Sequence, residues 1–323
     1  MTLQQLFFVA LTTEHLPDKN NLQIIAFSEC LGNRTSIRTR MKRFKQDEID
    51  AVMDYLASFT QYGFNADERN NYLNFSLDRF LKTLELIPDT ITAASKVLEL
   101  GASPYFMSLL IMKYLKCHVD YANYFGEKSQ QRQKEVLVSE KYNERHVFQF
   151  KNFNIENERF PYKNKSYDLV LFCEIIEHLT VDPVHSLVQI NRLLSDGGYL
   201  VVTTPNALRY ENILKLLLGK NIYDHYSGYG AYGRHNREYT PSEMRILAES
   251  LGFRIIRLYT KVTGSIKIKD FSIKRFRGFI QLMTTRYRGS NIFLLAQKVS
   301  DARPVHPKWL FESWYDTAGI NKR

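Results

Sequence analysis

The chain has 323 residues, 44% of them hydrophobic, and carries a formal net charge of +10. This length allows one sizeable α/β core with additions, or two small domains. Its 3 cysteines are isolated and show no CxxC spacing, which argues against a disulfide framework and a zinc site and fits a reducing compartment.

Residues 1–90 are predicted to form an N-terminal helical segment. Apolar residues recur at helical intervals in residues 46–63 and again in residues 73–87. The earlier apolar run from Leu6 to Leu11 lacks a basic lead-in and a cleavage pattern, and it is far too short for a membrane span. We therefore interpret that run as part of a packed helix and expect a soluble, cytoplasmic protein.

From residue 91 to residue 300, short β-rich runs alternate with helical patterns. Alternating units of this kind predict a parallel sheet with helices on both faces. The expected fold is α/β, a doubly wound and mostly parallel seven-stranded sheet. Its last two strands could pair antiparallel at one edge, because no strong amphipathic helix separates them. The predicted strands are residues 96–102, 117–125, 146–153, 166–174, 198–206, 253–262 and 291–299.

A capping pattern opens the helix that precedes the sixth predicted strand. Thr240 stands at the cap, and Pro241 follows at the first helical position. Glu243 comes three residues after the cap, and Gly252 provides a stop. Together these four signals predict a helix within residues 239–253.

The run VLELGASPYF, residues 97–106, ends the first predicted strand in a turn with a single glycine. Ligands of doubly wound sheets bind beyond the carboxyl ends of the strands, so we expect this turn in the binding site. A dinucleotide loop needs further glycines, but Ser103 and bulkier residues occupy those places, and Pro104 removes a backbone donor. The turn therefore disfavours NAD and FAD, whereas a nucleoside without phosphate does not need the missing groups.

Four segments stand in an order and at a spacing that indicate one family. They are VLELGASPYF, FPYKNKSYDLVLFCEIIEHL, INRLLSDGGYLVVTTPN and GRHNREYTPSEMRILAESLGF. Together they resemble the class I S-adenosylmethionine-dependent methyltransferases, most closely the small-molecule branch with an E-x-x-E-H-L motif, over about residues 90–300. The resemblance implies a Rossmann-like methyltransferase fold and S-adenosyl-L-methionine as cofactor.

The family's cofactor contacts carry over by position. The resemblance implies that Asn123 meets the ribose hydroxyls at the end of the second strand, with Asp120 as the alternative in another register. An amide can still bond a ribose diol, but its acceptor is neutral, so we expect a weaker contact than a carboxylate would make. The implied cofactor residues are Glu99, Gly101, Ala102 and Ser103 in the first loop, Asn123, then Asn154 and Ile155 beside the adenine, and Cys173 and Glu174 near the methionine moiety.

Some of these residues also have a purely structural interpretation. Asn154 and Ile155 fit an ordinary strand exit followed by a polar turn. Cys173 fits a small buried apolar residue better than a reactive thiol. Ser103 and Pro104 depart from the family's usual glycine pattern, although the strand and the first glycine remain.

Two histidines are the candidates for catalysis. The cofactor supplies the activated methyl group, so the protein must align the acceptor, exclude water and, for a hydroxyl, remove a proton. His178 follows the fourth predicted strand and His235 precedes the capped helix, and either could be the general base. The alternatives are that His178 packs at a helix start and that His235 anchors a covering loop. No dense carboxylate–histidine cluster in the sequence suggests a metal.

Residues 207–239 are expected to form a lid. They are rich in tyrosine, with Tyr223, Tyr226, Tyr229 and Tyr232 around flexible glycines. Such a segment fits closure over a polar acceptor such as a sugar. The alternative is a loop packed by its own aromatic side chains.

Residues 261–323 carry nearly all of the net charge, with 13 Lys and Arg against 4 Asp and Glu. An acidic partner is expected there: a phosphorylated substrate, an anionic membrane surface or nucleic acid. A basic insertion at residues 264–289 interleaves apolar and basic residues, as on a membrane-surface helix, and a C-terminal tail follows over residues 301–323. The alternative is a solvated basic face with no partner.

These observations favour methyl transfer to a small molecule or glycan, at oxygen, with an acceptor that can be anionic. A nucleic-acid methyltransferase is an alternative, but base-amino methyltransferases of this fold usually carry an N/D-P-P-Y/F element where this chain has FCEI, and no RNA-binding module is evident. A non-catalytic binding protein that keeps the fold is another alternative, and an NAD-dependent oxidoreductase is a distant third.

Overall fold

The computed structural model describes residues 44–61, 63–124, 133–228, 230–263 and 287–311. Three of the predicted segments lie wholly or largely outside these described residues. They are the helix around Leu6–Leu11, the basic insertion as far as residue 286, and the tail beyond residue 311.

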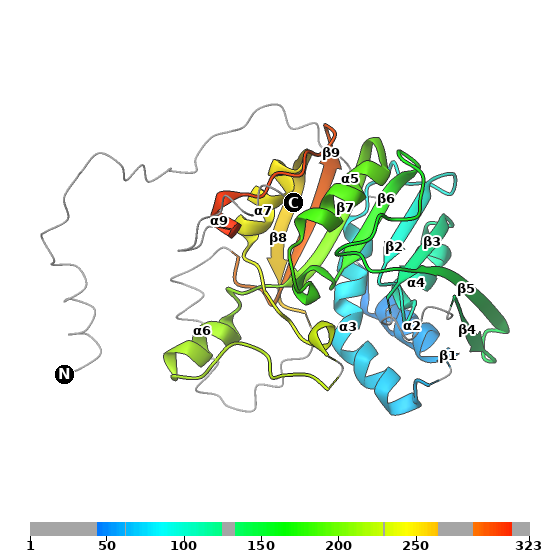
Figure 1. Cartoon of the computed structure of the whole chain (residues 1–323). Coiled ribbons are helices and arrows are strands. Elements are labelled where there is room, and N and C mark those ends of the chain that lie inside the picture. The colour runs from blue at the N-terminus through cyan, green and yellow to red at the C-terminus, as the bar shows by residue number, and fades with distance from the viewer. Residues whose placement is uncertain (1–43, 62, 125–132, 229, 264–286, 312–323) are drawn as a thin grey trace, which may run out of the picture. The chain divides into compact units, whose positions relative to one another are not determined.

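The described strands form one mixed sheet of nine, in the order β1-β4-β5-β3-β2-β6-β7-β9-β8 (Figure 1). The strands run parallel from β5 through β3, β2 and β6 to β7, and both ends of the sheet are antiparallel. Their bounds are β1 Thr60–Gln61, β2 Lys96–Leu100, β3 His118–Asn123, β4 Lys134–Ser139, β5 Glu144–Asn152, β6 Tyr167–Cys173, β7 Leu194–Pro205, β8 Phe253–Lys261 and β9 Asn291–Lys298.

The predicted seven-stranded, mostly parallel sheet is wrong in two respects. β1 and β4 extend the sheet beyond β5, and half of the pairings between described strands are antiparallel. β4 and β5 are joined by the short turn at residues 140–143, so β4 covers an edge that β5 would otherwise expose. Neither added strand could be predicted from the sequence, because β1 has only two residues and β4 has only three apolar ones.

The seven predicted strands themselves are all present, and the expected antiparallel edge is confirmed by the pairing of β8 with β9. The α/β class is also confirmed, because helices cover both faces of the sheet. Alternate residues of a strand point to opposite faces. In β6, Leu169 and Leu171 join one core while Val170 and Phe172 join the other, and all four are fully buried.

The helices divide between those two cores. α2, α3 and α4 pack on the first face, and α5 and α7 pack on the second (Figure 1). The bounds are α2 Gln46–Ala57, α3 Ala66–Leu86, α4 Phe106–Tyr114, α5 Val184–Leu193, α6 Tyr210–Leu217, α7 Pro241–Ser250 and α9 Lys308–Phe311, with short 3-10 turns η2 Ile176–His178 and η3 Ala231–Gly233. No helix of the described residues is both long and apolar enough to cross a bilayer.

The described part of the N-terminal segment is helical and is built into the sheet's own core. Leu56 of α2 and Leu73 and Leu84 of α3 are fully buried there. α3 begins at a reciprocal cap, in which the Asn65 side chain accepts from the backbone N–H of Glu68 and the Glu68 carboxylate accepts from that of Asn65. α3 therefore lies against the sheet with a fixed start, close to the ends of the strands.

The capping pattern predicted for α7 is confirmed. The Thr240 side chain accepts from the backbone N–H of Glu243, and the Glu243 carboxylate accepts from the backbone N–H of Thr240. Pro241 is the first residue of the helix, and Gly252 follows its end with φ +81°. This helix begins directly after the segment predicted to form a lid, so it fixes where that segment ends.

Candidate functional site

A cavity of about 320 Å³ opens beyond the carboxyl ends of β2, β3 and β6. It brings together all nine residues that the sequence predicted to contact a cofactor, and His178 as well. His235 lies outside its lining but close to His178. The remaining lining residues are Tyr72, Arg79, Phe80, Thr83, Pro104, Phe106, Met107, Ala122, Tyr124, Ile175, Leu179, Thr203 and Tyr232.

The turn after β2 depends on Gly101. Its φ is +67°, a conformation that residues with a side chain rarely adopt. A Cβ built there would lie 2.1 Å from Cδ1 of Ile175, and the Gly101 N–H donates to the carbonyl of Ala122 at 2.8 Å. The single glycine of this loop therefore stands where a side chain would collide with the segment that follows β6.

Asn123, the last residue of β3, holds this turn in place. Its Oδ1 accepts from the backbone N–H of Ser103 at 3.0 Å, and its Nδ2 donates to the hydroxyl of Tyr105 at 2.8 Å. Asp120, the alternative ribose partner, accepts from the Tyr167 hydroxyl at 2.7 Å and does not line the cavity. The structure thus places the amide, and not the carboxylate, at the cavity, while its contact with a ribose stays a prediction.

Two carboxyl groups from neighbouring strands face this cavity. Glu99 is buried and accepts from the hydroxyl of Ser108, and burial raises the pKa of Glu99 to about 8. Glu174 accepts from Nη1 of Arg79 at 2.9 Å and from Nδ2 of Asn291 at 3.2 Å. Glu99 therefore holds its proton at neutral pH, whereas Glu174 forms an ion pair with Arg79.

α3 forms one wall of the cavity, a role that no pattern in the sequence predicted. Tyr72, Arg79, Phe80 and Thr83 of this helix line it. The sequence predicted the N-terminal helices as an extension and the site at the strand ends alone. The available signal was Arg79 itself, because a charged residue among the buried leucines of one helix face needs a partner.

Cys173 lies at the end of β6 in the cavity wall. Burial raises the pKa of its thiol to about 12, so the thiol stays protonated at neutral pH. A thiol is a poor nucleophile in that state. This environment argues against a reactive role for Cys173, which is half-buried in the cavity wall rather than fully buried as the sequence suggested.

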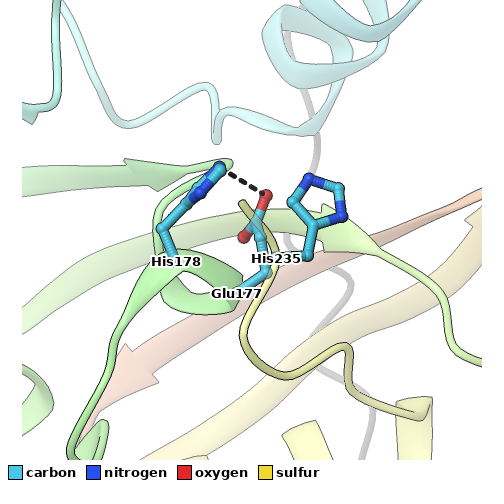
Figure 2. A group of neighbouring side chains, drawn as sticks. All are labelled: Glu177, His178 and His235. Atoms are coloured by element: carbon cyan, nitrogen blue, oxygen red, sulfur yellow. Dashed lines mark ion pairs between the residues drawn. The ribbon is translucent and has the colours of Figure 1, made fainter. Parts of the chain in front are cut away.

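Glu177, His178 and His235 gather beside the cavity (Figure 2). The two imidazole rings are 5.0 Å apart, and Oε1 of Glu177 lies 4.0 Å from Nε2 of His178. Glu177 is fully buried, and its Oε2 accepts from the hydroxyl of Thr204 at 2.9 Å. The sequence could not show this group as a cluster, because the second histidine comes from the distant segment 207–239.

Hydrogen bonds assign the tautomer of both histidines. His178 Nδ1 lies 2.9 Å from the carbonyl oxygen of Arg234, and His235 Nδ1 lies 3.1 Å from Oε1 of Glu238. The carbonyl can only accept. Although burial opposes ionisation, hydrogen bonds from His235 and Arg209 lower the pKa of Glu238 to about 2, so this carboxylate also accepts. Each Nδ1 therefore carries a proton, and in the neutral form of either ring the lone pair lies on Nε2.

The ionisation of the group follows from its burial. Burial, helped by the neighbouring His235, lowers the pKa of His178, so its ring is neutral at physiological pH. Burial and the nearby Glu174 carboxylate raise the pKa of Glu177 well above its ordinary value. The three side chains thus offer the neutral imidazole of His178, the imidazole of His235 and one carboxyl group with a raised pKa.

The predicted lid is tied to this group by its C-terminal half. The Asn236 backbone N–H donates to the carbonyl of Glu177 at 2.7 Å, and its Nδ2 donates to that of His178 at 2.9 Å. The Tyr232 hydroxyl accepts from Nδ2 of Asn154 at 3.1 Å, and Tyr232 lines the cavity. Tyr223 and Tyr226 are 75% and 90% exposed and take no part in that lining, and Tyr229 lies outside the described residues.

A family model described as a methyltransferase domain matches residues 69–258, more than half of the chain. The chain belongs to the methyltransferase-domain family. The prediction of a methyltransferase with S-adenosyl-L-methionine as cofactor is confirmed at the level of this family. Membership of this family does not determine the small-molecule branch, the acceptor or the atom that receives the methyl group.

Solved structures with a similar fold include several S-adenosylmethionine-dependent methyltransferases. The one from Archaeoglobus fulgidus is 13% identical, with a TM-score of 0.44 over 70% of this chain and 93% of that one. The one from Mesorhizobium loti is 11% identical, with a TM-score of 0.41 over 69% of this chain and 97% of that one. The one from Aquifex aeolicus is 13% identical, with a TM-score of 0.39 over 79% of this chain and 99% of that one. Values this low say nothing of this methyltransferase's substrate. No curated protein matches the sequence significantly.

The residues of the cavity fit the methyltransferase's cofactor. Gly101 has no side chain, so the backbone of the first loop comes close to the cavity. The residues of this loop that line the cavity include no cation that would favour a phosphate. Asn123 retains a second lone pair and a second N–H for a diol. Asn154 and Ile155 stand at the exit of the neighbouring strand β5, on the cavity side.

Proposed function

We propose that this methyltransferase acts on a hydroxyl oxygen of a small molecule or glycan. The observation that carries the proposal is the position of His178, whose neutral ring stands in the wall of the same cavity as the nine predicted cofactor residues. A neutral imidazole with a lowered pKa can accept the proton of a hydroxyl near pH 7. Amine acceptors, which carry their own lone pair once deprotonated, have less need of such a group.

The residues of the site divide the work as follows. Bound S-adenosyl-L-methionine supplies a methyl group on a positively charged sulfur, which leaves with the electron pair of the broken carbon–sulfur bond. The Arg234 carbonyl holds His178 by its Nδ1–H, which leaves Nε2 to take the proton that the acceptor hydroxyl gives up as the new carbon–oxygen bond forms. Tyr232 and α3 line the cavity, and their side chains would limit the access of water to a bound acceptor.

The wall formed by α3 and α4 suits the acceptor side of the site. The rings of Tyr72, Phe80 and Phe106 lie with their centroids 6.1–6.5 Å apart and form a continuous aromatic surface. An aromatic surface can pack against the apolar face of a sugar or of an aromatic acceptor. We include an anionic acceptor, or an anionic membrane surface, in the proposal because residues 261–323 concentrate the positive charge of the chain.

Transfer of labelled methyl groups tests this proposal. The full chain is incubated with S-adenosylmethionine carrying tritium in its methyl group and with fractionated cell extract. We expect label in a low-molecular-weight or glycan fraction, in a linkage that resists mild base as an ether does. Label in nucleic acid or protein would contradict the acceptor class, and absence of cofactor binding by calorimetry would favour the non-catalytic alternative.

A further inference from the structure

The side chains of Glu177, His178 and His235 offer three ligand atoms that all lie within 4.8 Å of one another. In Figure 2 the Glu177 carboxylate lies between the two imidazole rings. Ligand atoms around a four-coordinate ion with bonds near 2.1 Å lie ~3.4 Å apart. Small rotations of the side chains would therefore close this group around a single ion.

Both histidines are already oriented as metal ligands usually are. Metal-bound imidazoles generally donate their second N–H to a carbonyl or a carboxylate, which fixes the ring and keeps the ligating nitrogen unprotonated. His178 donates in this way to the carbonyl of Arg234, and His235 donates to the carboxylate of Glu238. In the neutral form of either ring this leaves the lone pair on Nε2.

Glu177 provides an independent observation. It is fully buried, and its Oε1, the atom that faces His178, has no hydrogen-bond partner among the described residues. Its other oxygen is satisfied by Thr204. A buried carboxylate oxygen without a partner is unfavourable, and a cation at this place would supply the missing interaction. The neighbouring Glu174 differs, because Arg79 and Asn291 already satisfy it.

We propose that Glu177, His178 and His235 bind one divalent transition-metal ion, such as Mn²⁺, Co²⁺ or Zn²⁺. Two imidazole nitrogens and one carboxylate suit these ions, whereas Mg²⁺ and Ca²⁺ prefer sites made of oxygen alone. Three protein ligands leave coordination positions open, which is typical of catalytic sites.

The acceptor's hydroxyl can occupy one of the open coordination positions. This part of the inference rests on the proposed function. His178 belongs to both the metal group and the cavity wall, so the ion adjoins the cavity. A metal ion lowers the pKa of a hydroxyl bound to it. With the ion present, the site is therefore specific for acceptors with a hydroxyl that can coordinate. Nε2 of His178 is then a ligand and no longer takes the proton. The ion makes the hydroxyl acidic, and the hydroxyl gives its proton to a solvent water as its oxygen takes the methyl group.

Titration with Co²⁺ tests the site without cofactor or acceptor. The full chain is freed of metal with a chelator, and visible absorption bands of Co²⁺ are followed as the ion is added. We expect one saturable site. His235→Ala and Glu177→Gln should weaken Co²⁺ binding by at least the ~10–100-fold that is typical even for partners of ligands. His225→Ala is the matched control, because His225 is exposed in the same segment and should leave the affinity unchanged.

Calorimetry of S-adenosylmethionine on the same samples separates the two proposals. Cofactor binding in the variants shows that they are folded. Wild-type protein that binds the cofactor but gives no saturable Co²⁺ spectrum, or a spectrum equally strong in His235→Ala and Glu177→Gln, would overturn the metal site and leave the methyltransferase proposal intact. A Co²⁺ site in protein that binds no cofactor would overturn the proposed function alone.

Discussion

Arg79 and Glu174 form a largely buried ion pair, with Nη1 and Oε2 2.9 Å apart, that joins α3 to the residue that follows β6. Removing one partner of such a pair leaves an uncompensated charge. Arg79→Met should therefore lower the free energy of unfolding by about 3–5 kcal/mol, and the double variant Arg79→Met/Glu174→Gln by less. Denaturant unfolding measures both.

The exposed pair Arg245–Glu249, 3.6 Å apart, is the control for that experiment. Arg245→Met should change the free energy of unfolding by less than about 1 kcal/mol, because solvent screens the pair. Equal losses in Arg79→Met and Arg245→Met would show that the Arg79 pair is not worth more than a surface contact.

Gly101→Ala should weaken binding of S-adenosylmethionine, because the new Cβ would collide with Ile175 and displace the first loop. Gly219 has nearly the same φ, +68°, with nothing within 4 Å of an added Cβ. Both substitutions strain the backbone, at a cost of about 1–2 kcal/mol each. By calorimetry we expect a loss of affinity of roughly tenfold or more in Gly101→Ala only, and a similar loss in Gly219→Ala would refute the steric argument.

Asn123→Ala should also weaken cofactor binding, since it removes two hydrogen bonds that hold Ser103 and Tyr105. Two such bonds are worth about 1–3 kcal/mol together. Asn123→Asp keeps the acceptor for Ser103 and adds a charged acceptor for a diol, so its affinity should equal or exceed that of the wild type. Asp120→Asn, outside the cavity lining, should have no effect on affinity. A larger loss in Asp120→Asn than in Asn123→Ala would mean that the other register is used.

The raised pKa of Glu99, about 8, makes stability depend on pH. Between the ordinary pKa of a glutamate and 8, the folded chain keeps a proton that the unfolded chain loses. Stability is therefore fully present below the unfolded pKa and falls as pH rises through 8. The advantage of Glu99→Gln over the wild type should grow from pH 5 to pH 8 and then level off. The exposed Glu140→Gln should show no such trend, and a constant difference for Glu99→Gln would contradict the shift.

The lowered pKa of His178 sets the acid limb of activity. The imidazole of His178 stays unprotonated, and so able to act as a base or as a metal ligand, to a lower pH than that of an ordinary histidine, whose pKa is about 6.5. We expect kcat/KM to fall only below that value. In His178→Ala, kcat should drop and this limb should vanish. Retention of both the rate and the limb would exclude His178 from the chemistry.

The sequence predicted those features that leave a local pattern. Apolar runs predicted seven of the nine described strands, and the cap at Thr240 predicted the start of α7. It did not predict β1 or β4, whose pairing depends on a partner strand rather than on their own few residues. The loop after β2 was placed correctly because parallel strands end on one side of the sheet.

The parts of the candidate site that escaped prediction are contacts between distant segments. Arg79 reaches Glu174 only because α3 packs across the ends of the strands. His235 meets Glu177 only because Asn236 ties its segment to the turn after β6. Neither contact has a repeat or a spacing in the sequence, so only the folded chain reveals them.

The start of α3 has a practical consequence for dissecting the protein. The family match begins at residue 69, but the helix that lines the cavity begins at Ala66, after its cap at Asn65. A fragment cut at the edge of the family match would lose this cap and all of α2, whose Leu56 is buried in the core of the sheet. The smallest autonomous unit of this enzyme therefore begins upstream of the stretch by which its family is recognised.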